Sequence, residues 1–342
     1  MERRNFIAKG IVAGAVIPAA YSLIGQDAIA ASQNGLTNNG TNRFPPENDP
    51  VVIERPVSGK PHKGKVLAVI QPHCDDLALF AGGTIAKLVD EGYTAYMIRT
   101  SNDDVAGLGK TLGERVVNNE NDTEATAKVL GITKVYDLHY RNHRMDEYNI
   151  QEIKGRLIFL FRLLKVDTII CYDPWGHYEE NPDHYVTAKA VEAARWMAGS
   201  LDYPEHMEVV KPHLVEERYY FARGPQLVNR VVDISKYIDI KVESNVVIKT
   251  QGPGGDAGAR LRKSLSDQGK TLAVLGDNDD TANSSFVKNF VLDIDSEFHR
   301  AVPSDKEVGK KYGLEWAEQF HYFGKPESKI GAYVEKNAVR KG

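Results

Sequence analysis

Cysteine is nearly absent from this sequence, since only Cys74 and Cys171 occur among 342 residues. Both lie at or near the ends of predicted strands, so a fold held together by disulfides is excluded as an interpretation. An excess of charge of one sign is also missing, because the formal net charge is −4. Nothing therefore suggests a nucleic acid or an anionic membrane as a partner. Long apolar runs are absent beyond the N-terminus, so no spanning helix is expected in the body of the chain.

The N-terminus has the pattern of an export signal. The pair Arg3-Arg4 belongs to a basic start, an apolar stretch follows over 11–24, and an Ala-x-Ala cleavage pattern stands at 28–30. The apolar stretch is short and contains Gly and Pro, which favours a cleaved signal peptide (1–30) over a membrane anchor. We therefore expect an exported protein, periplasmic or extracellular, without a stable membrane anchor after cleavage. The twin-arginine route and the general secretory route both stay open as the path of export.

From position 65 onwards the sequence alternates between strand patterns and helix patterns. Apolar runs predict strands at 65–71, 93–100, 134–138, 167–172, 214–222 and 228–233. Helical spacing of apolar residues predicts helices at 82–91, 119–130, 150–164, 184–198 and 235–249. Strands that alternate with helices imply an α/β fold with a doubly wound, mostly parallel sheet, which is a Rossmann-like three-layer domain with C-terminal additions.

The expected division of the chain follows from its composition. It comprises a signal peptide (1–30), a linker rich in Asn, Gly, Pro and Ser (31–64), one domain (65–323) and a C-terminal tail (324–342). Residues 253–305 are polar and weakly patterned, so this segment is either an insertion or a flexible lid. An aromatic, amphipathic stretch at 312–323 is expected to dock on the body of the domain.

Residues 72–76, with the sequence Pro-His-Cys-Asp-Asp, are the most informative part of the chain. They follow a predicted strand directly, so a His and two acids lie at its C-terminal end, where open α/β sheets bind their ligands. A second cluster, Asn-Pro-Asp-His at 181–184, opens a later helix. Two imidazoles and one carboxylate suit a catalytic metal with three protein ligands, and a neighbouring acid is left for proton transfer.

These motifs resemble the PIG-L/LmbE family of metal-dependent N-acetylglucosaminyl deacetylases. That family carries His-x-Asp-Asp after its first strand, then Gly-Gly, and later Pro-Asp-His. The matching residues are His73, Asp75, Asp76, Gly82, Gly83, Pro182, Asp183 and His184. A weaker third pattern matches Asp233, Ser235, Lys241 and Gln251. The resemblance covers residues 65–252 and 312–323.

Carried over to these positions, the resemblance implies that His73, Asp76 and His184 bind Zn²⁺, with another divalent metal as the alternative. It implies that Asp75 is the general base, which takes a proton from the water that attacks an acetamide carbonyl. Asp183 is expected to accept a hydrogen bond from a ligand imidazole and so to orient it.

The sequence departs from the family at several positions. Many members carry His where Asn181 stands, and an amide can donate a hydrogen bond but cannot deliver a proton. We hypothesise that His177, in the same strand-to-helix loop, takes that catalytic role beside Asn181; an ordinary loop histidine is the alternative. The family's sugar-binding Arg corresponds to Asn119 here, and its loop Asp corresponds to Asn142.

Several residues are candidates for contact with the substrate. Candidate contacts are Gly82, Gly83, Asn142 and Trp175, although close helix packing explains the glycines equally well and simple packing explains the tryptophan. The basic loop 141–144 either meets a sugar acid or is a solvated face. We expect a small-molecule or oligosaccharide substrate and no nucleic acid, and the sequence does not indicate the oligomeric state.

Two classes of function are considered. The first is an exported hydrolase that removes an N-acetyl group from a GlcNAc-type sugar or a related amide. The second is a carbohydrate-binding protein on the same fold with lost or altered turnover. A nucleotide-binding protein is disfavoured, because acids stand where a phosphate-binding loop would be needed.

Overall fold

The computed structural model describes residues 50–200, 209–294, 302–325 and 329–339. The predicted signal peptide (1–30) and the first part of the predicted linker lie outside the described residues, so both stay predictions. Among the helices that are described, none is long and apolar enough to cross a membrane.

The described residues form one sheet with the strand order β1-β7-β8-β6-β5-β2-β3-β4. The strands are β1 (Val52–Glu54), β2 (Val66–Gln71), β3 (Thr94–Ser101), β4 (Lys134–Tyr140), β5 (Thr168–Tyr172), β6 (Glu217–Phe221), β7 (Arg230–Asp233) and β8 (Ala317–Phe323). From β4 to β6 all neighbours are parallel. β8 runs antiparallel to both β6 and β7, whereas β1 is parallel to β7.

The order of the parallel strands creates a point where the direction of the winding reverses. The chain proceeds from β2 to β3 and β4 on one side, and then returns to the other side of β2 with β5 and β6. β2 and β5 are neighbours in register, with Leu67 opposite Thr168. The loops that follow β2 and β5 therefore leave the same edge of the sheet side by side, at the position where such sheets bind ligands.

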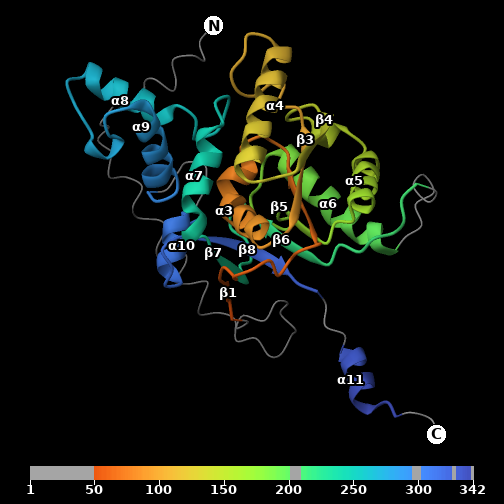
Figure 1. Cartoon of the computed structure of the whole chain (residues 1–342). Helices are drawn as coiled ribbons and strands as arrows, with labels where there is room; N and C mark the ends of the chain where they lie inside the picture. Colours follow the sequence, from red (N-terminus) through yellow and green to blue (C-terminus); the bar gives the residue numbers. More distant parts are fainter. Residues whose placement is uncertain (1–49, 201–208, 295–301, 326–328, 340–342) are drawn as a thin grey trace, which may run out of the picture. The chain divides into compact units, whose positions relative to one another are not determined.

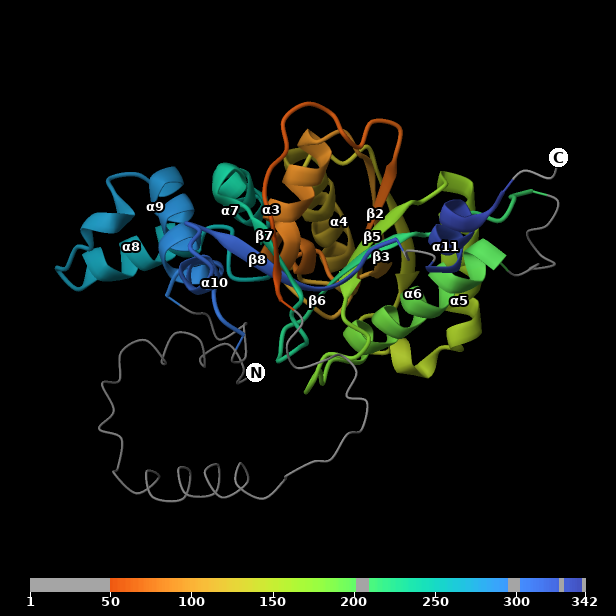
Figure 2. The same ribbon diagram turned by 90° about the horizontal axis from the view of Figure 1, so that it is seen from below.

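Helices cover both faces of this sheet. The described α-helices are α3 (Asp76–Asp90), α4 (Leu112–Val129), α5 (Ile150–Leu164), α6 (Pro182–Ser200), α7 (Ile238–Val246), α8 (Ala257–Asp267), α9 (Asp279–Phe286), α10 (Asp305–Lys311) and α11 (Lys329–Asn337). α3, α4 and α7 lie on one face, and α5 and α6 lie on the other (Figures 1 and 2). Fully buried Leu67, Ile85, Phe161 and Ile170 belong to the core between these layers. The predicted doubly wound α/β fold is confirmed.

Three predicted elements differ from the structure, and one of them is α4, which begins at Leu112, seven residues before the expected helix at 119–130. α3 begins at Asp76, six residues before the expected helix at 82–91, because the glycine pair lies inside the helix rather than at its start. A Cβ on Gly83 would lie 2.7 Å from the side chain of Ile234, so close packing of the helix requires a residue without one. The closing stretch 312–323 contains β8, which lies between β6 and β7 in the sheet. Its pairing partners lie about a hundred residues earlier, and local periodicity does not reveal them.

The segment 253–305 is largely helical where it is described. α8 packs against α9, and α9 contacts α7, which lies between α9 and α4 in both views (Figures 1 and 2). Part of the expected linker is also structured, since β1 pairs with β7 at the edge of the sheet.

A buried ion network joins α7, β8 and α10. The Lys241 ammonium is fully buried and lies 2.6 Å from carboxylate oxygens of both Glu318 and Asp305. Glu318 also accepts hydrogen bonds from the backbone N–H groups of Gly83 and Thr84 in α3. Glu318 of β8 therefore binds α3 directly, and the ion pairs of the buried Lys241 join α7 to β8 and α10.

Lys241→Met is expected to lower the free energy of unfolding by about 3–5 kcal/mol, because it leaves two buried carboxylates without their cation. Denaturant unfolding of the full chain measures this change. Lys288→Met is the matched control, since Lys288 pairs with Asp239 at an exposed site and such pairs contribute about 1 kcal/mol or less. Equal losses in the two variants would contradict a stabilising role for the buried network.

Candidate active site

Two loops from the central edge of the sheet carry the candidate residues. β2 ends at Gln71 and α3 begins at Asp76, so His73 stands in the short turn between them. His184 lies in the first turn of α6, in the helix that follows β5. The oxygen of the Asn181 side chain accepts a hydrogen bond from the Asp183 backbone N–H (3.0 Å) and so caps the start of α6. Local capping therefore fixes the turn from which His184 projects.

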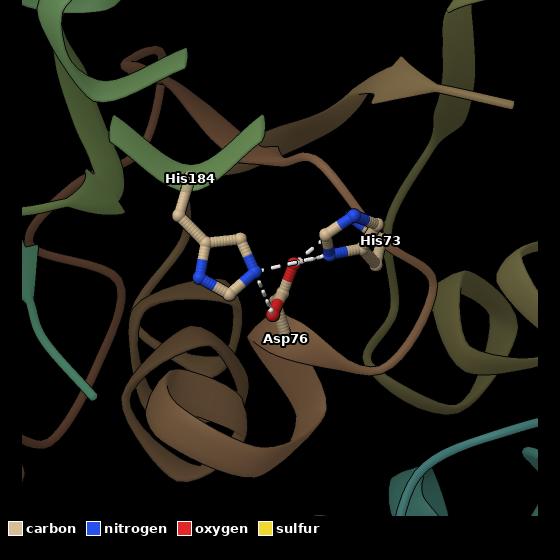
Figure 3. Close-up of side chains that lie close together, drawn as sticks. All are labelled: His73, Asp76 and His184. Atoms are coloured by element: carbon tan, nitrogen blue, oxygen red, sulfur yellow. Dashed lines mark hydrogen bonds and ion pairs between the residues drawn. The ribbon is translucent and has the colours of Figure 1, made fainter. Parts of the chain in front are cut away.

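Three side chains converge from these separate elements (Figure 3). His73 Nδ1 lies 3.0 Å from His184 Nε2. The Asp76 carboxylate lies 3.4 Å from the first nitrogen and 3.5 Å from the second. Ligands of a tetrahedral zinc ion, at about 2.0–2.1 Å from the metal, stand about 3.3 Å from one another. His73, Asp76 and His184 therefore fit a single metal ion, and their donor types suit zinc.

Carboxylates hold the far nitrogens of both imidazoles. His73 Nε2 lies 3.1 Å from Asp183 Oδ2, and His184 Nδ1 lies 3.0 Å from Glu179 Oε2. A proton on each far nitrogen leaves the other nitrogen with a lone pair that faces the common point. Asp183 also accepts hydrogen bonds from the backbone N–H groups of His143 and Met145. Asp183 is therefore held in the position from which it can orient the His73 imidazole.

The two adjacent acids have different surroundings. The Tyr172 hydroxyl donates a hydrogen bond to Asp76 Oδ1 (2.6 Å). Burial tends to raise the pKa of Asp76, but the facing imidazoles of His184 and His73 outweigh it and hold this pKa below its usual range. Burial, together with the charge of Asp76, instead raises the pKa of Asp75 to about 7. A carboxylate with that pKa is suited to accept a proton near neutral pH.

The Asp75 carboxylate packs directly against the backbone of Gly252. The φ angle of Gly252 is +74°, and a Cβ at this position would lie 2.7 Å from Asp75 Oδ2. Both the backbone conformation and the close approach therefore require glycine.

A cavity of about 230 Å³ opens beside these groups. Its lining residues are His73, Asp75, Asp76, Leu79, Phe80, Ala106, His143, Asn181, His184, Arg223, Gln251 and Gly252. The three metal-binding candidates, the proposed base and Asn181 thus share one cavity, as the sequence predicts. His143, Arg223 and Gln251 add further hydrogen-bond donors to its wall.

Four predicted substrate contacts do not line this cavity. Gly82 and Gly83 lie within α3, where they approach Ser244 and Ile234, so they serve helix packing. The buried amide of Asn142 donates a hydrogen bond to Asp103 (3.1 Å). Trp175 stacks at a tilt against the rings of His321 and Phe323. These four residues contact other parts of the protein and lie outside the cavity lining, so their contact with a substrate stays a prediction.

His177 is exposed and lies outside the lining of this cavity. It borders a second, smaller hollow on the Glu179 side of His184, and its backbone N–H donates a hydrogen bond to the Pro225 carbonyl. His177 therefore does not line the cavity that holds Asp75 and the three metal-binding candidates. Its expected catalytic role has no support in this geometry.

Sequence reasoning missed several residues of the site. Tyr172 ends a predicted strand, and Glu179 precedes the second motif by two residues. Neither belongs to a sequence pattern that predicts its contact with Asp76 or His184. His143 stands in the basic loop that the sequence leaves between a substrate contact and a solvated face. The arginines of that loop are paired, Arg141 with Asp104 and Arg144 with Glu147, whereas His143 lines the cavity.

Known proteins resemble this chain in sequence and in fold. Residues 68–195 match the family model described as PIG-L, GlcNAc-PI de-N-acetylase. A diacetylchitobiose deacetylase from Thermococcus kodakarensis is 26% identical over 195 residues, which are 55% of this chain and 71% of that relative. The solved N,N'-diacetylchitobiose deacetylase from Pyrococcus horikoshii has a TM-score of 0.58 at 20% identity, covering 76% of this chain and 84% of its own. A 4-carboxy-2-hydroxymuconate hydratase from Pseudomonas putida has a TM-score of 0.53 at 14% identity. The match covers 78% of this chain and 98% of the hydratase chain.

The two structural similarities concern the fold, and the hydratase among them illustrates that this fold does not determine one reaction. The sequence match is more specific, because residues 68–195 include both the turn with His73 and Asp76 and the helix start with His184. Residues 68–195 are thus similar to the PIG-L family, and this stretch holds the three side chains that converge in the site.

Proposed function

We propose that this protein is a metal-dependent hydrolase that removes the N-acetyl group from a GlcNAc-type sugar or a related amide. The observation that carries the proposal is the convergence of His73, Asp76 and His184 beside a cavity that also holds Asp75. The names of the PIG-L family model and of the diacetylchitobiose deacetylase support an acetylated sugar as the substrate.

Zinc is the proposed metal, with another divalent ion as the alternative. His73 Nδ1, His184 Nε2 and the Asp76 carboxylate would hold it, because their spacing and donor types suit a site with three protein ligands. When bound, such a metal supplies a Lewis acid that lowers the pKa of water to about 7 and polarises a carbonyl oxygen.

The residues of the chain then perform the proton transfers. Asp75 accepts a proton from the water whose oxygen forms a bond to the acetamide carbon. The protonated Asp75 donates that proton to the nitrogen as the C–N bond breaks, so that acetate and a free amine leave. Asp183 and Glu179 keep the two imidazoles in place during the reaction.

The alternative, a carbohydrate-binding protein without turnover, is not favoured. Binding alone does not need a carboxylate with a raised pKa beside three metal-binding side chains. One departure from the family also has a structural explanation, because the Asn119 amide donates hydrogen bonds to the carbonyls of Asp103, Ala106 and Arg115. Asn119 thereby fastens the loop that contributes Ala106 to the cavity wall.

The proposal is tested by incubating the purified protein with N-acetylglucosamine and N,N'-diacetylchitobiose and measuring released acetate and free amine in equal amounts. A chelator should abolish release, and added Zn²⁺ should restore it. Absence of acetate from every N-acetylated sugar offered to the metal-loaded protein, with intact folding, would refute the proposed function.

We propose in addition that the protein is exported, on the basis of Arg3-Arg4, the apolar stretch 11–24 and the Ala-x-Ala pattern at 28–30. The mature protein is then expected to begin near Ala31 and to be found outside the cytoplasm. Replacing Arg3 and Arg4 by Lys should block export by the twin-arginine route and leave general secretion intact. N-terminal sequencing that finds Met1 on exported protein would contradict cleavage.

A further inference from the structure

We propose that His143 donates a hydrogen bond to the carbonyl oxygen of the substrate's acetamide, where negative charge develops during the attack of water. This inference rests on the proposed deacetylation and adds to it a residue outside the two motifs. It assigns the donor role to the loop after β4 instead of the loop after β5, where the sequence placed His177.

The backbone of His143 is held in an unusual conformation. Its φ angle is +58°, in the left-handed region that favours glycine. A residue with a side chain adopts this conformation at a cost of about 1–2 kcal/mol. Its N–H donates a hydrogen bond of 2.7 Å to Asp183 Oδ2, the same oxygen that faces His73 Nε2. One carboxylate oxygen therefore fixes both the loop and a metal-binding imidazole.

The ring of His143 stands next to the metal-binding candidates. It meets the ring of His73 edge to face, with centroids 5.7 Å apart and an angle of 81° between the planes. It lines the cavity together with Asp75 and His184. Among the described residues, none forms a hydrogen bond with its ring nitrogens, so an N–H is available to a ligand.

The other candidate donors on the cavity wall are each engaged through at least one polar atom, and Gln251 Nε2 donates a hydrogen bond to Asn119 Oδ1 at 3.0 Å. Asn181 uses its side-chain oxygen to cap α6, which leaves only the amide nitrogen of a short side chain. Arg223 donates through Nη2 to Glu179 at 2.7 Å. The His143 ring has neither constraint, and the role requires no proton to leave or join it.

Loss of one such donor is expected to lower kcat by about 10²–10³-fold. His143→Gly removes the ring and suits the φ angle of +58°, so its melting temperature should equal or exceed that of the wild type. A residue with a purely structural role would not combine gained stability with lost turnover. KM should change by only a few-fold, and the metal content should stay unchanged.

The structure offers a matched control in His139, whose φ angle is +56°. His139→Gly relieves the same kind of strain outside the cavity lining, so kcat should be unaffected while stability responds in the same way. His143→Asn tolerates the conformation and retains an N–H donor, so it should recover at least tenfold of the lost rate. Added imidazole should also restore part of the rate in His143→Gly.

Acetate binding provides a readout that does not depend on turnover. Calorimetric titration of metal-loaded protein with acetate, the expected product, should show affinity at least tenfold weaker in His143→Gly, as expected for a lost hydrogen bond to a charged ligand. If wild-type protein deacetylates none of the sugars, the proposed function fails, while this titration still tests the donor. Unchanged kcat and unchanged acetate affinity in His143→Gly would overturn the inference, as would a larger loss in Asn181→Ala.

Discussion

Replacing His184 by alanine is expected to remove the metal and the activity together. His184 Nε2 lies 3.0 Å from His73 Nδ1 and 3.5 Å from Asp76, and two remaining ligands hold a zinc ion poorly. Metal content should fall from about one ion per chain to almost none, and kcat/KM should fall by on the order of 10³-fold or more, because the Lewis acid contributes several kcal/mol. His73→Ala should behave in the same way. Elemental analysis of the purified variants, together with acetate release, measures both effects.

The chain contains its own control for this experiment. Glu120, Asp137 and His139 form a second group of metal-binding side chain types in the described part of the structure, but His139 is exposed and the group lies outside the cavity lining. His139→Ala should therefore leave metal content and turnover unchanged. Full metal occupancy in both His73→Ala and His184→Ala would exclude the proposed metal centre.

Asp75→Asn is expected to keep the metal and to lower kcat by about 10²–10⁴-fold, the range for the loss of a general base. The substitution preserves the shape of the side chain that fits against Gly252, so folding should be unaffected. Asp76→Ala should instead lose the metal, because its carboxylate faces both imidazoles. Metal loss in Asp75→Asn with retention in Asp76→Ala would mean that the two acids have the opposite roles.

The pH dependence gives a second measurement of the same role. A base must be unprotonated to work, so the rate falls as the pH drops through its pKa. Burial and the charge of Asp76 raise the pKa of Asp75 to about 7, and a nearby cation lowers a carboxylate pKa. The acidic limb of the kcat/KM profile should therefore lie at or below a pH of about 7, and Asp75→Asn should lack it.

The sequence by itself determined the elements and the position of the motifs. Continuous apolar runs predicted strands close to β2, β3 and β5, since strands of a parallel sheet are buried on both faces. Because parallel strands end at one edge of a sheet, His73 and His184 could be expected near each other before their distance was known. Their residue types and the neighbouring acids indicated metal-assisted chemistry.

Only the tertiary structure decided which other side chains reach the cavity. His177 and His143 are both loop histidines, and no local pattern distinguishes them; the φ angle of His143 and its bond to Asp183 turn one loop toward His73. Tyr172 reaches Asp76 only because β5 pairs with β2, whereas Glu179 faces His184 five residues further along the chain. Such contacts join residues up to about 110 positions apart in the chain, so they depend on strand order and backbone direction, which residue spacing along the sequence does not encode.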